Sequence, residues 1–537
     1  MIGKDDRRAH AKAAAAQGGP KIDIGSSSFS EVRKAEDGPL VIRKLSQHQA
    51  REPGRRMQDA GAAAIKKEGL DHGSDRVSSS LRSSVLEGTL TSAGGSIQGS
   101  FATPLALSLN ATNAEVGLMN SLMCLASTVS LIPGAMLTKY YGRKAIWVAS
   151  QLVSRVFIWF PILLLPLLPS GNAVLLLIAL LAVSSFCLEI RGPAWSSLMG
   201  DIVPAGMKGR YFGRRNFAMG ISGMAATLFA GLLLAGYGFQ AIFLLSIALS
   251  AASVIFFRRV HEPPLSLAFH YRYVFSFSPR GWLAGMALNR NLTTFTVYVT
   301  LMNFAVCISS PFYAVYMLRN LDIGYGWFAV VVVVGALSNA LTQRYWGRLN
   351  DRYGSRKILV TCGALACFVP FMWIFVSGIG QILLIKIYDG FVYAGFDSVI
   401  FNYLLDSAPA KNRPKHIANH SFFAGMGEVF GSLFGAFLAS GIGGASFLML
   451  SGLQVIFAIS FAARLACLSV LPMVGEIKIR QTQVAPVRYV FWQAVAVEPI
   501  RGIQNAIGFT FRYPARVERE LRENAKSLRF RIKMRMG

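Results

Sequence analysis

Apolar runs of about 20 residues recur from about residue 87 to residue 472, and they constrain the fold of this chain more than any other feature. Each run is long enough to cross the hydrocarbon core of a bilayer as an α-helix. The composition agrees, because 53% of the 537 residues are hydrophobic and 15% are charged. Soluble domains carry roughly 25% charged residues. The sequence therefore predicts an all-α integral membrane protein.

Twelve spans are predicted, with limits good to a few residues. They cover residues 87–109, 114–138, 144–167, 172–199, 216–237, 239–258, 292–318, 323–345, 357–378, 381–405, 417–440 and 445–471. This divides the chain into two six-helix halves, at 85–258 and 292–472, which a cytoplasmic linker at 259–291 joins. Residues 1–84 are polar and are expected to form a disordered cytoplasmic tail. Residues 473–537 are expected to form a basic cytoplasmic tail.

The net charge of +27 comes from basic residues in the tails and short loops. Loops that follow even-numbered spans are rich in Lys and Arg, whereas loops that follow odd-numbered spans hold only Arg319. By the positive-inside rule, this places both termini in the cytoplasm and the spans in the cell membrane. The same charges favour contact with anionic lipid at the inner leaflet over nucleic-acid binding.

The chain offers little sign of catalysis or of a bound cofactor. All six cysteines lie inside apolar runs and none forms a CxxC pair, so neither a disulfide framework nor a zinc site is indicated. HExxH, GxSxG and Walker motifs are absent from the sequence. We therefore expect a monomeric protein that is not an enzyme and uses no cofactor or metal.

A loop motif occurs once in each half. The better copy follows the predicted span 323–345 and contains Gly347, Asp351, Arg352, Gly354 and Arg356. A degraded copy, a little over two hundred residues earlier, is Thr138-Lys139-Tyr140-Tyr141-Gly142-Arg143-Lys144. Asp-X-X-Pro-Ala segments that begin at Asp201 and Asp406 repeat at a similar offset of 205 residues. Duplicated halves with substrate handled between them are typical of secondary transporters.

The motif resembles the signature of the major facilitator superfamily, G-x-L-x-D-R-x-G-R-K. The second copy fits with Ser355 inserted, whereas the first has Lys139 where the Asp belongs and Ala135 where the first Gly belongs. The resemblance covers roughly residues 85–472. It implies two pseudo-symmetric six-helix bundles around a central cavity, which opens alternately to the two sides of the membrane. It implies no particular substrate.

The motif also has a physical interpretation of its own. Its glycines let two helix ends approach closely, and its Arg and Lys residues hold the turn in the cytoplasm. Asp351 can accept hydrogen bonds from the start of the span at 216–237, where Arg214 and Arg215 lie. We expect this contact to act as a cytoplasmic gate, with simple anchoring of topology as the alternative.

Charged residues at mid-membrane are costly and usually mark a pathway or a salt bridge. Five are predicted there: Arg155, Glu189, Arg191, Asp397 and Glu428. For the first three, an ion-pair network and recognition of an anionic substrate are equally open. For the two carboxylates of the second half, a proton-coupling role competes with simple hydrogen bonding to neighbours.

Three polar residues at the same depth, Gln98, Asn120 and Asn303, are candidate substrate contacts, with interhelical packing as the alternative. For polar residues of the first and seventh spans, the family resemblance implies this role. Lys386 and Asp389 lie three residues apart on one helical face and should form a local pair. Arg464 is expected to extend its side chain to the inner interface.

These observations predict a proton-coupled secondary active transporter that moves a small organic solute. Efflux, rather than uptake, is what the resemblance to the superfamily implies. A nutrient or organic-anion importer of the same superfamily and a scaffold or sensor that no longer transports are the alternatives.

Overall fold

A computed structural model describes residues 53–138, 140–168, 170–204, 207–263, 290–407, 413–442, 451–476 and 491. The chain falls into two units, Met1–Lys67 and Glu68–Gly537. Of the first unit only helical residues from Pro53 onward are described, and the helical bundles below belong to the second. The predicted linker, apart from its first and last few residues, and almost all of the basic C-terminal tail lie outside the described residues.

The described part of the chain contains helices and no strand. The first half comprises α1 Pro53–Ser108, α2 Asn113–Leu137, α3 Arg143–Leu152, the π-helical turn η1 Val153–Phe157, α4 Trp159–Leu164, η2 Leu165–Leu167, α5 Ser170–Ile202 and α6 Lys208–Arg258. The second half comprises α9 Arg290–Ser309, α10 Phe312–Val315, η4 Tyr316–Asn320, α11 Tyr325–Tyr353, α12 Ser355–Ile374, α13 Ile379–Ser407, α14 Arg413–Ile442, α15 Gly452–Cys467 and η5 Leu468–Met473.

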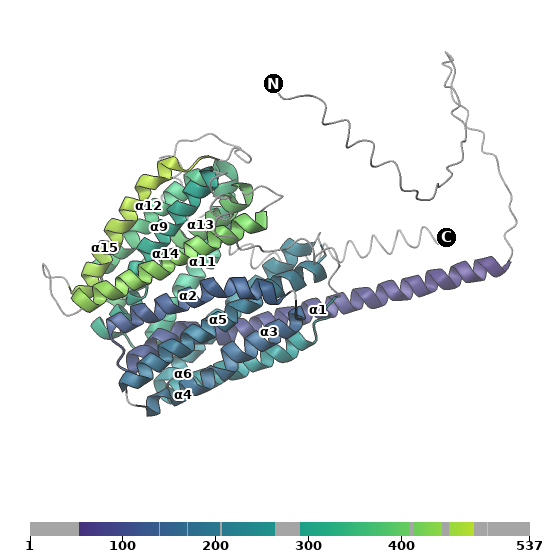
Figure 1. Ribbon diagram of the computed structural model, residues 1–537, viewed down its shortest axis with the longest axis horizontal. Helices are drawn as coiled ribbons and strands as arrows, with labels where there is room; N and C mark the ends of the chain where they lie inside the picture. Colours follow the sequence, from purple (N-terminus) through teal and green to yellow (C-terminus); the bar gives the residue numbers. More distant parts are fainter. Residues whose placement is uncertain are drawn as a thin grey trace, which may run out of the picture. The chain divides into compact units, whose positions relative to one another are not determined.

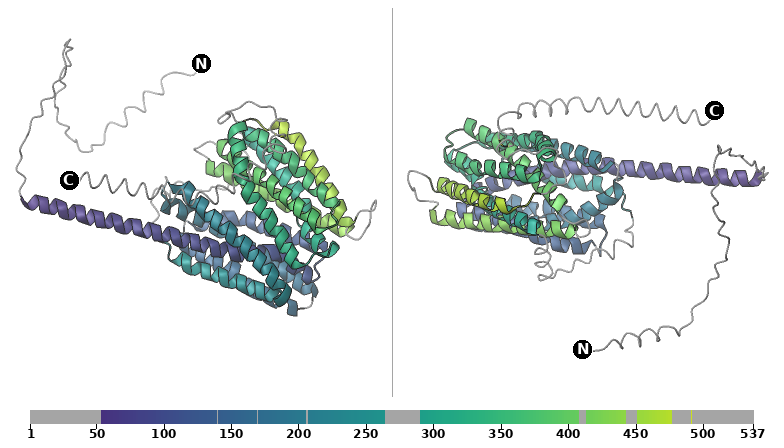
Figure 2. Two further views of the ribbon diagram at one scale, coloured as in Figure 1. Left: turned by 180° about the vertical axis from the view of Figure 1, so that it is seen from behind. Right: turned by 90° about the horizontal axis from the view of Figure 1, so that it is seen from above.

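The helices of each half pack mainly with one another, as Figures 1 and 2 show. In the first half α5 packs on α2 and α3, and α6 packs on α3 and α4. In the second half α13 packs on α11 and α12, while α9 packs on α14 and α15. Two seams join these bundles, one between α2 and α14 and the other between α6 and α11.

Helix α6 is a hairpin of two helices rather than one rod. Its 51 residues include Gly238, whose φ of 75° and ψ of 178° interrupt the helix. Ser222 donates to Thr89 O and Ser246 donates to Gly94 O, both on α1. On a straight helix these serines would lie about 36 Å apart, whereas their partners are only five residues apart on α1. The chain therefore folds back at Gly238, which confirms the predicted division into 216–237 and 239–258.

Helix α1 begins earlier than the sequence indicated. Residues 53–84, predicted to be disordered, belong to the same helix as the first span, so that prediction is wrong. Ser80, Ser83 and Ser84 are buried, and Ser80 Oγ accepts from the backbone N–H of His261 at 3.1 Å. Small polar residues that pack inside a bundle leave no apolar run, and hydropathy therefore missed this helix.

Ten helices in the described residues are long and apolar enough to cross a membrane. One of them is the α6 hairpin, which supplies two spans. Helix α1 is not among the ten, since its portion inside the bundle is rich in Ser, Gly and Thr. Counting both arms of α6 gives eleven such spans in the described residues, and the first of the twelve predicted spans, at the end of α1, stays a prediction.

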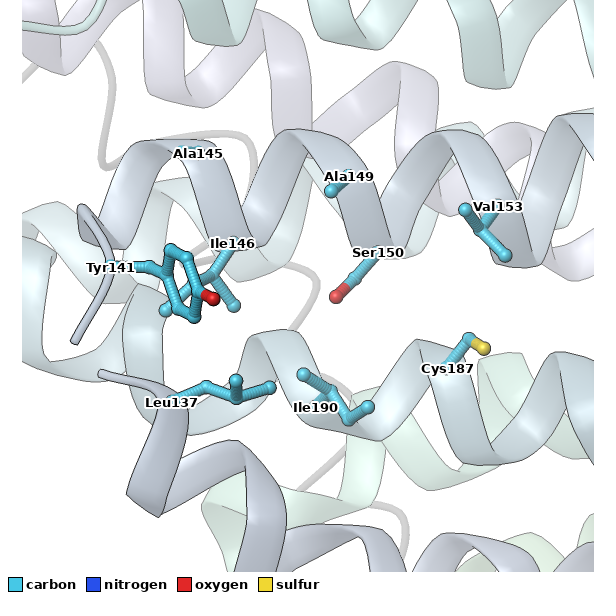
Figure 3. Close-up of a pocket in the computed structure, with 9 residues that line it drawn as sticks. All are labelled: Leu137, Tyr141, Ala145, Ile146, Ala149, Ser150, Val153, Cys187 and Ile190. Atoms are coloured by element: carbon cyan, nitrogen blue, oxygen red, sulfur yellow. The ribbon is translucent and has the colours of Figure 1, made fainter. Parts of the chain in front are cut away.

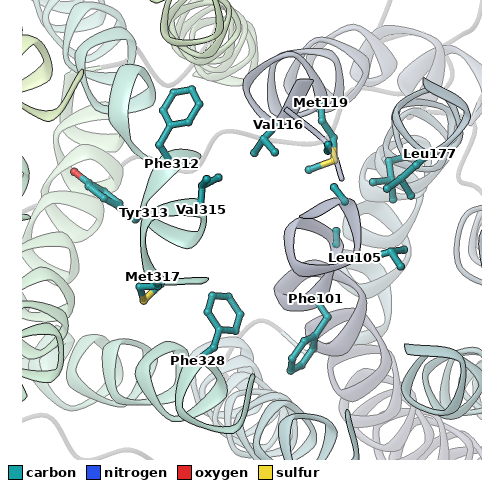
Figure 4. Close-up of a cluster of buried hydrophobic side chains, with 14 of the residues drawn as sticks. Phe101, Leu105, Val116, Met119, Leu177, Phe312, Tyr313, Val315, Met317 and Phe328 are labelled. Carbon is teal, nitrogen blue, oxygen red and sulfur yellow. The ribbon is translucent and has the colours of Figure 1, made fainter. Parts of the chain in front are cut away.

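The two ends of the bundles are packed differently. We call the end with the α2–α3 and α11–α12 turns the basic end, and the end with Arg319 the opposite end. At the opposite end one apolar cluster contains residues of both bundles, including Phe101 and Val116 of the first and Phe312 and Phe328 of the second (Figure 4). The rings of Phe101 and Phe328 are 6.1 Å apart. Towards the basic end each bundle has an apolar cluster of its own.

Candidate functional site

The first bundle holds a chain of polar contacts around the predicted arginines. Arg155 lies on the π-helical turn η1, and π-helical turns inside helices are frequent at functional sites. Its Nη1 donates to Oε1 of Gln98 at 2.7 Å, and Gln98 Nε2 returns a hydrogen bond to the Arg155 carbonyl at 3.1 Å. Gln98 is buried, so its reciprocal contact fixes the base of the arginine side chain. The predicted residues of the first and third spans therefore meet.

Arg191, on α5, is tied to the same region through Gln151. Its Nη1 donates to Oε1 of Gln151, and its guanidinium carbon lies 5.6 Å from the centre of the Trp147 ring. The buried Gln151 donates in turn to Ser253 at 3.1 Å and to Thr91 at 3.5 Å. Arg191 thus belongs to a hydrogen-bonded chain that reaches α1, α3 and α6.

A buried ion pair closes this chain towards the basic end. Arg215 Nη2 lies 3.0 Å from Oε2 of Glu87, and both side chains are almost fully buried. Thr91 Oγ1 donates to the other oxygen of Glu87 at 3.2 Å, and the Trp195 ring lies 4.4 Å from the arginine. A buried charge needs such a partner, because removing either one would leave the other uncompensated.

Glu189 lies close enough to Arg155 and Arg191 to interact electrostatically with both. Electrostatic interactions join it to Arg155 and Arg191, and the two arginines also repel each other. All three side chains belong to half-buried residues. The sequence left an ion-pair network and an anion site equally open here, and the structure places Glu189 within electrostatic range of both arginines.

In the second bundle Glu428 lies where the two bundles meet. Its Oε1 accepts from Asn303 Nδ2 of α9 at 3.1 Å, and it is also hydrogen-bonded to the Cys124 thiol of α2 in the other bundle. One turn further along α14, Asn120 of α2 donates to Ser432 at 2.7 Å. Three residues predicted separately, Asn120, Asn303 and Glu428, are therefore brought together at the α2–α14 seam.

Glycines allow α14 to pack directly on the α9 backbone. A methyl group added at Gly427, Gly431 or Gly435 would overlap a carbonyl oxygen of α9, those of Thr300, Phe304 and Ile308 respectively. At the seam between bundles, a methyl on Gly117 would lie 2.8 Å from the Ala436 side chain. The small-residue stripe that accompanies Glu428 therefore serves close helix approach.

The remaining charged residues that the sequence singled out in the second bundle have their recorded contacts away from the α2–α14 seam. Asp397 is exposed on α13 and interacts electrostatically with Cys362. Lys386 and Asp389 form the predicted local pair, at 3.0 Å. Arg464 is fully buried and donates to Ala366 O at 2.8 Å and to Ser309 at 3.2 Å, so the prediction that it extends to the interface is wrong. Buried carbonyl and hydroxyl groups on neighbouring helices satisfy it instead.

The first loop motif joins helix ends of its own bundle at the basic end. Gly142 is the N-cap of α3, and the side chain of Arg143 is fully buried. Arg143 Nη1 lies 2.5 Å from Asp201 at the end of α5, and its backbone N–H donates to Glu262 at 2.8 Å. Lys144 Nζ donates to the carbonyl oxygens of Arg258 and Val260 at 2.5 and 2.9 Å.

The second motif forms the turn between α11 and α12. Gly354 has a φ of 89°, a backbone conformation that residues other than glycine rarely adopt. Asp351 and Arg352 are exposed, as is Arg214, while Gly347 is half-buried. Arg356 Nη2 donates to Pro472 O at 3.4 Å. Arg215 was expected to assist Asp351, but in this structure it is paired with Glu87 of its own bundle.

An apolar groove of about 340 Å³ lies on the first bundle, between the end of α2, α3 and α5 (Figure 3). Leu137, Ile146, Val153 and Ile190 are among the side chains that line it. None of the sequence-predicted site residues borders this groove. We therefore do not place the candidate site there.

Sequence reasoning missed Glu87, Gln151 and Cys124 as members of these networks. Glu87 is the one charged residue within 85–108, and it could have been found as a carboxylate inside the first span. Gln151 and Cys124 carry no comparable signal, because their importance comes from which residues face them across helices.

Comparison with known proteins agrees with this architecture. A family model described as Major Facilitator Superfamily matches residues 88–344 and 292–499. Synaptic vesicle glycoprotein 2C from Rattus norvegicus is 28% identical over 109 residues, and its Homo sapiens counterpart matches equally. That alignment spans 20% of this chain and only 15% of the relative.

Solved transporter structures share the fold at low sequence identity. A mutant of the nucleoside transporter NupG superposes with a TM-score of 0.59 at 14% identity, over 73% of this chain and all of that chain. A bacterial homologue of the iron transporter ferroportin, in an inward-facing state, gives a TM-score of 0.54 at 15% identity, over 73% of this chain and 98% of its own. At such identities the likeness concerns the fold alone.

Proposed function

Because the chain belongs to the Major Facilitator Superfamily, we propose that it is a proton-coupled secondary transporter of a small organic solute. Transport by alternating access, rather than catalysis, is the activity that a two-bundle membrane protein of this family supports. The observation that carries the proposal is Glu428, a carboxylate that contacts both bundles at the seam between α2 and α14.

The packing of the bundles supports an alternating-access cycle. At the opposite end a shared apolar cluster joins the bundles, and Arg319 Nη2 of the second bundle donates to Ala111 O of the first at 2.6 Å. Towards the basic end the apolar clusters of the two bundles are separate. We interpret this as the state that is closed at the opposite end and open at the basic end. In the state with the other side open, the contacts between bundles at the opposite end would break and new ones would form at the basic end.

The distribution of basic residues supports a placement in the membrane. We propose that the basic end faces the cytoplasm, where the positive-inside rule puts loops rich in Lys and Arg. Both termini then lie in the cytoplasm, and the membrane is the cytoplasmic membrane. The structure would accordingly be inward-facing. The same loops would contact anionic lipid of the inner leaflet, and one chain suffices to form the cycle described here.

Glu428 is suited to couple protons to this cycle. When charged, its carboxylate can only accept hydrogen bonds, and Asn303 and the Cys124 thiol both have hydrogen to donate. When protonated, it gains a donor and loses the charge that makes these bonds strong. Since Cys124 belongs to the other bundle, a change of protonation alters a contact across the seam. A proton gradient could therefore shift the equilibrium between the two states of the transporter through the protonation of Glu428.

Transport assays in proteoliposomes test the proposal. Purified protein is reconstituted and given a panel of nucleosides, sugars, amino acids and organic acids, with and without an imposed pH gradient. Wild type should accumulate at least one solute against its gradient, and Glu428→Gln should lose accumulation while keeping solute counterflow, because exchange needs no net proton movement. Asp322→Asn is the matched control, since Asp322 is an exposed carboxylate in the turn after η4, at the opposite end, and has no predicted part in the proton pathway.

The assay also decides between the alternatives. Gradient-driven accumulation by Glu428→Gln equal to wild type would show that Glu428 is not the coupling group. Solute movement in neither direction would favour a scaffold or sensor. We predicted efflux, and the sign of the pH gradient that drives accumulation separates an exporter from an importer.

A further inference from the structure

We propose that Arg155 and Arg191 bind an oxyanion group of the transported solute, a carboxylate or a phosphate, in the interior of the first bundle. This inference rests on the proposed transport function and names the chemical class of its solute. The argument depends on the charge balance of the network, on donors left without acceptors and on open space beside Arg155.

The charges of the network do not balance. It contains the arginines Arg155, Arg191 and Arg215 and the carboxylates Glu87 and Glu189, which leaves one positive charge in excess. Arg215 and Glu87 neutralise each other as a buried pair. Arg191 is attracted by Glu87 as well as by Glu189, whereas Arg155 is repelled by Arg191 and is attracted by the carboxylate of Glu189. Charges in a membrane protein interior are costly unless they are paired, so this arrangement favours a second anion.

The arginines keep donors available for such an anion. The Nε of Arg155 is buried and has no hydrogen-bond partner among the described residues. Nη1 of each arginine is held by a glutamine, Gln98 or Gln151, which orients the guanidinium without neutralising it. A planar guanidinium fork matches the two oxygens of a carboxylate or phosphate. Arginines oriented by neutral amides are thus suited to bind an oxyanion.

Open space lies next to Arg155. Gly95 of α1 faces it, since a methyl at Gly95 would lie 3.3 Å from Arg155 Nη2. One turn further along the same helix face, a methyl at Gly99 would meet nothing within 4 Å. Both arginines are half-buried and not sealed off. A ligand atom can therefore approach the guanidinium of Arg155 along the glycine face of α1.

Glu189 gives the proposal a distinctive consequence. It interacts with the same two arginines, so its carboxylate competes with the oxyanion of the solute for them. Neutralising Glu189 should strengthen oxyanion binding, whereas a residue needed only to hold the bundle together would weaken binding or stability when changed. The two roles are therefore separable by experiment.

The test is ligand-induced thermal stabilisation of the purified full-length protein, because a ligand that binds the folded state raises its stability by mass action. The probes are inorganic phosphate, benzoate with its neutral partner benzamide, and adenosine monophosphate with adenosine, at an ionic strength matched with chloride. The oxyanions should stabilise wild type and the neutral partners should not. Benzoate alone would identify a carboxylate site, and the phosphates alone a phosphate site.

Four variants complete the test. Arg155→Gln and Arg191→Gln should each weaken oxyanion binding about 10- to 100-fold, the range for loss of one charge-assisted contact. Glu189→Gln should tighten it several-fold. The control Arg210→Gln removes an exposed arginine at the basic end and should bind like wild type. If an arginine variant fails to fold, Gly99→Leu fills the open space beside Arg155 and should abolish the stabilisation.

Three outcomes would overturn the inference: equal stabilisation by neutral and anionic partners, oxyanion binding unaffected in Arg155→Gln, or no stabilisation of wild type by any oxyanion. These outcomes are independent of the proposed transport function. A protein that transports a neutral solute and ignores oxyanions refutes only this inference. A protein that binds oxyanions through Arg155 but moves no solute in liposomes refutes only the proposed function.

Discussion

Replacing Gly431 with alanine tests whether α14 and α9 are locked together by backbone contact. The added methyl group would overlap the Phe304 carbonyl oxygen and lie 2.9 Å from its carbon. The overlapping atoms of Phe304 belong to the backbone, so the overlap can be removed only if α14 and α9 move apart. Overpacking of this kind costs about 1–3 kcal/mol. The same contact between α14 and α9 includes Gly427 and Gly435, which would have to shift with Gly431.

The control is Gly220→Ala in α6, where a methyl group meets nothing within 4 Å. Alanine gains roughly 1 kcal/mol over glycine in a helix interior, and this gain applies to both variants. The difference in unfolding free energy between Gly431→Ala and Gly220→Ala therefore isolates the packing cost, and should be about 1–3 kcal/mol. Thermal or denaturant unfolding in one detergent measures it. If the two variants are equally stable, α14 and α9 are not packed as described.

Two further predictions concern topology and the gate. With the native cysteines replaced, a cysteine at Gly441 should react with an impermeant maleimide from outside intact cells, and one at Gly209 only after permeabilisation; the reverse pattern would contradict the proposed orientation. In the state that is closed at the basic end, Asp351 should make a contact worth about 1.5–3 kcal/mol. Asp351→Asn removes this contact and should shift the equilibrium between the two states tenfold to a hundredfold towards the state that is open at the basic end. A reporter cysteine at Gly99 should then label faster from the basic end, and unchanged labelling in a folded protein would leave the motif as an anchor of topology.

The sequence alone was sufficient for the features that depend on local periodicity. Apolar runs of membrane length located the spans, including the break near Gly238 that the structure shows as a hairpin. The pair of Lys386 and Asp389 followed from their spacing of three residues. The loop motif and the family resemblance could also be recognised from the sequence, because they depend on residues near one another along the chain.

Tertiary structure decided which distant residues meet. Arg215 pairs with Glu87, 128 residues away, and not with Asp351, the partner expected from the loop motif. Glu428 joins Asn303 and Cys124 from two bundles. The buried polar face of α1 was invisible to hydropathy, which measures average apolarity and not what a helix packs against. The physical reason is that a side chain inside a membrane protein is stabilised by its partners on neighbouring helices, and helix packing alone determines those partners.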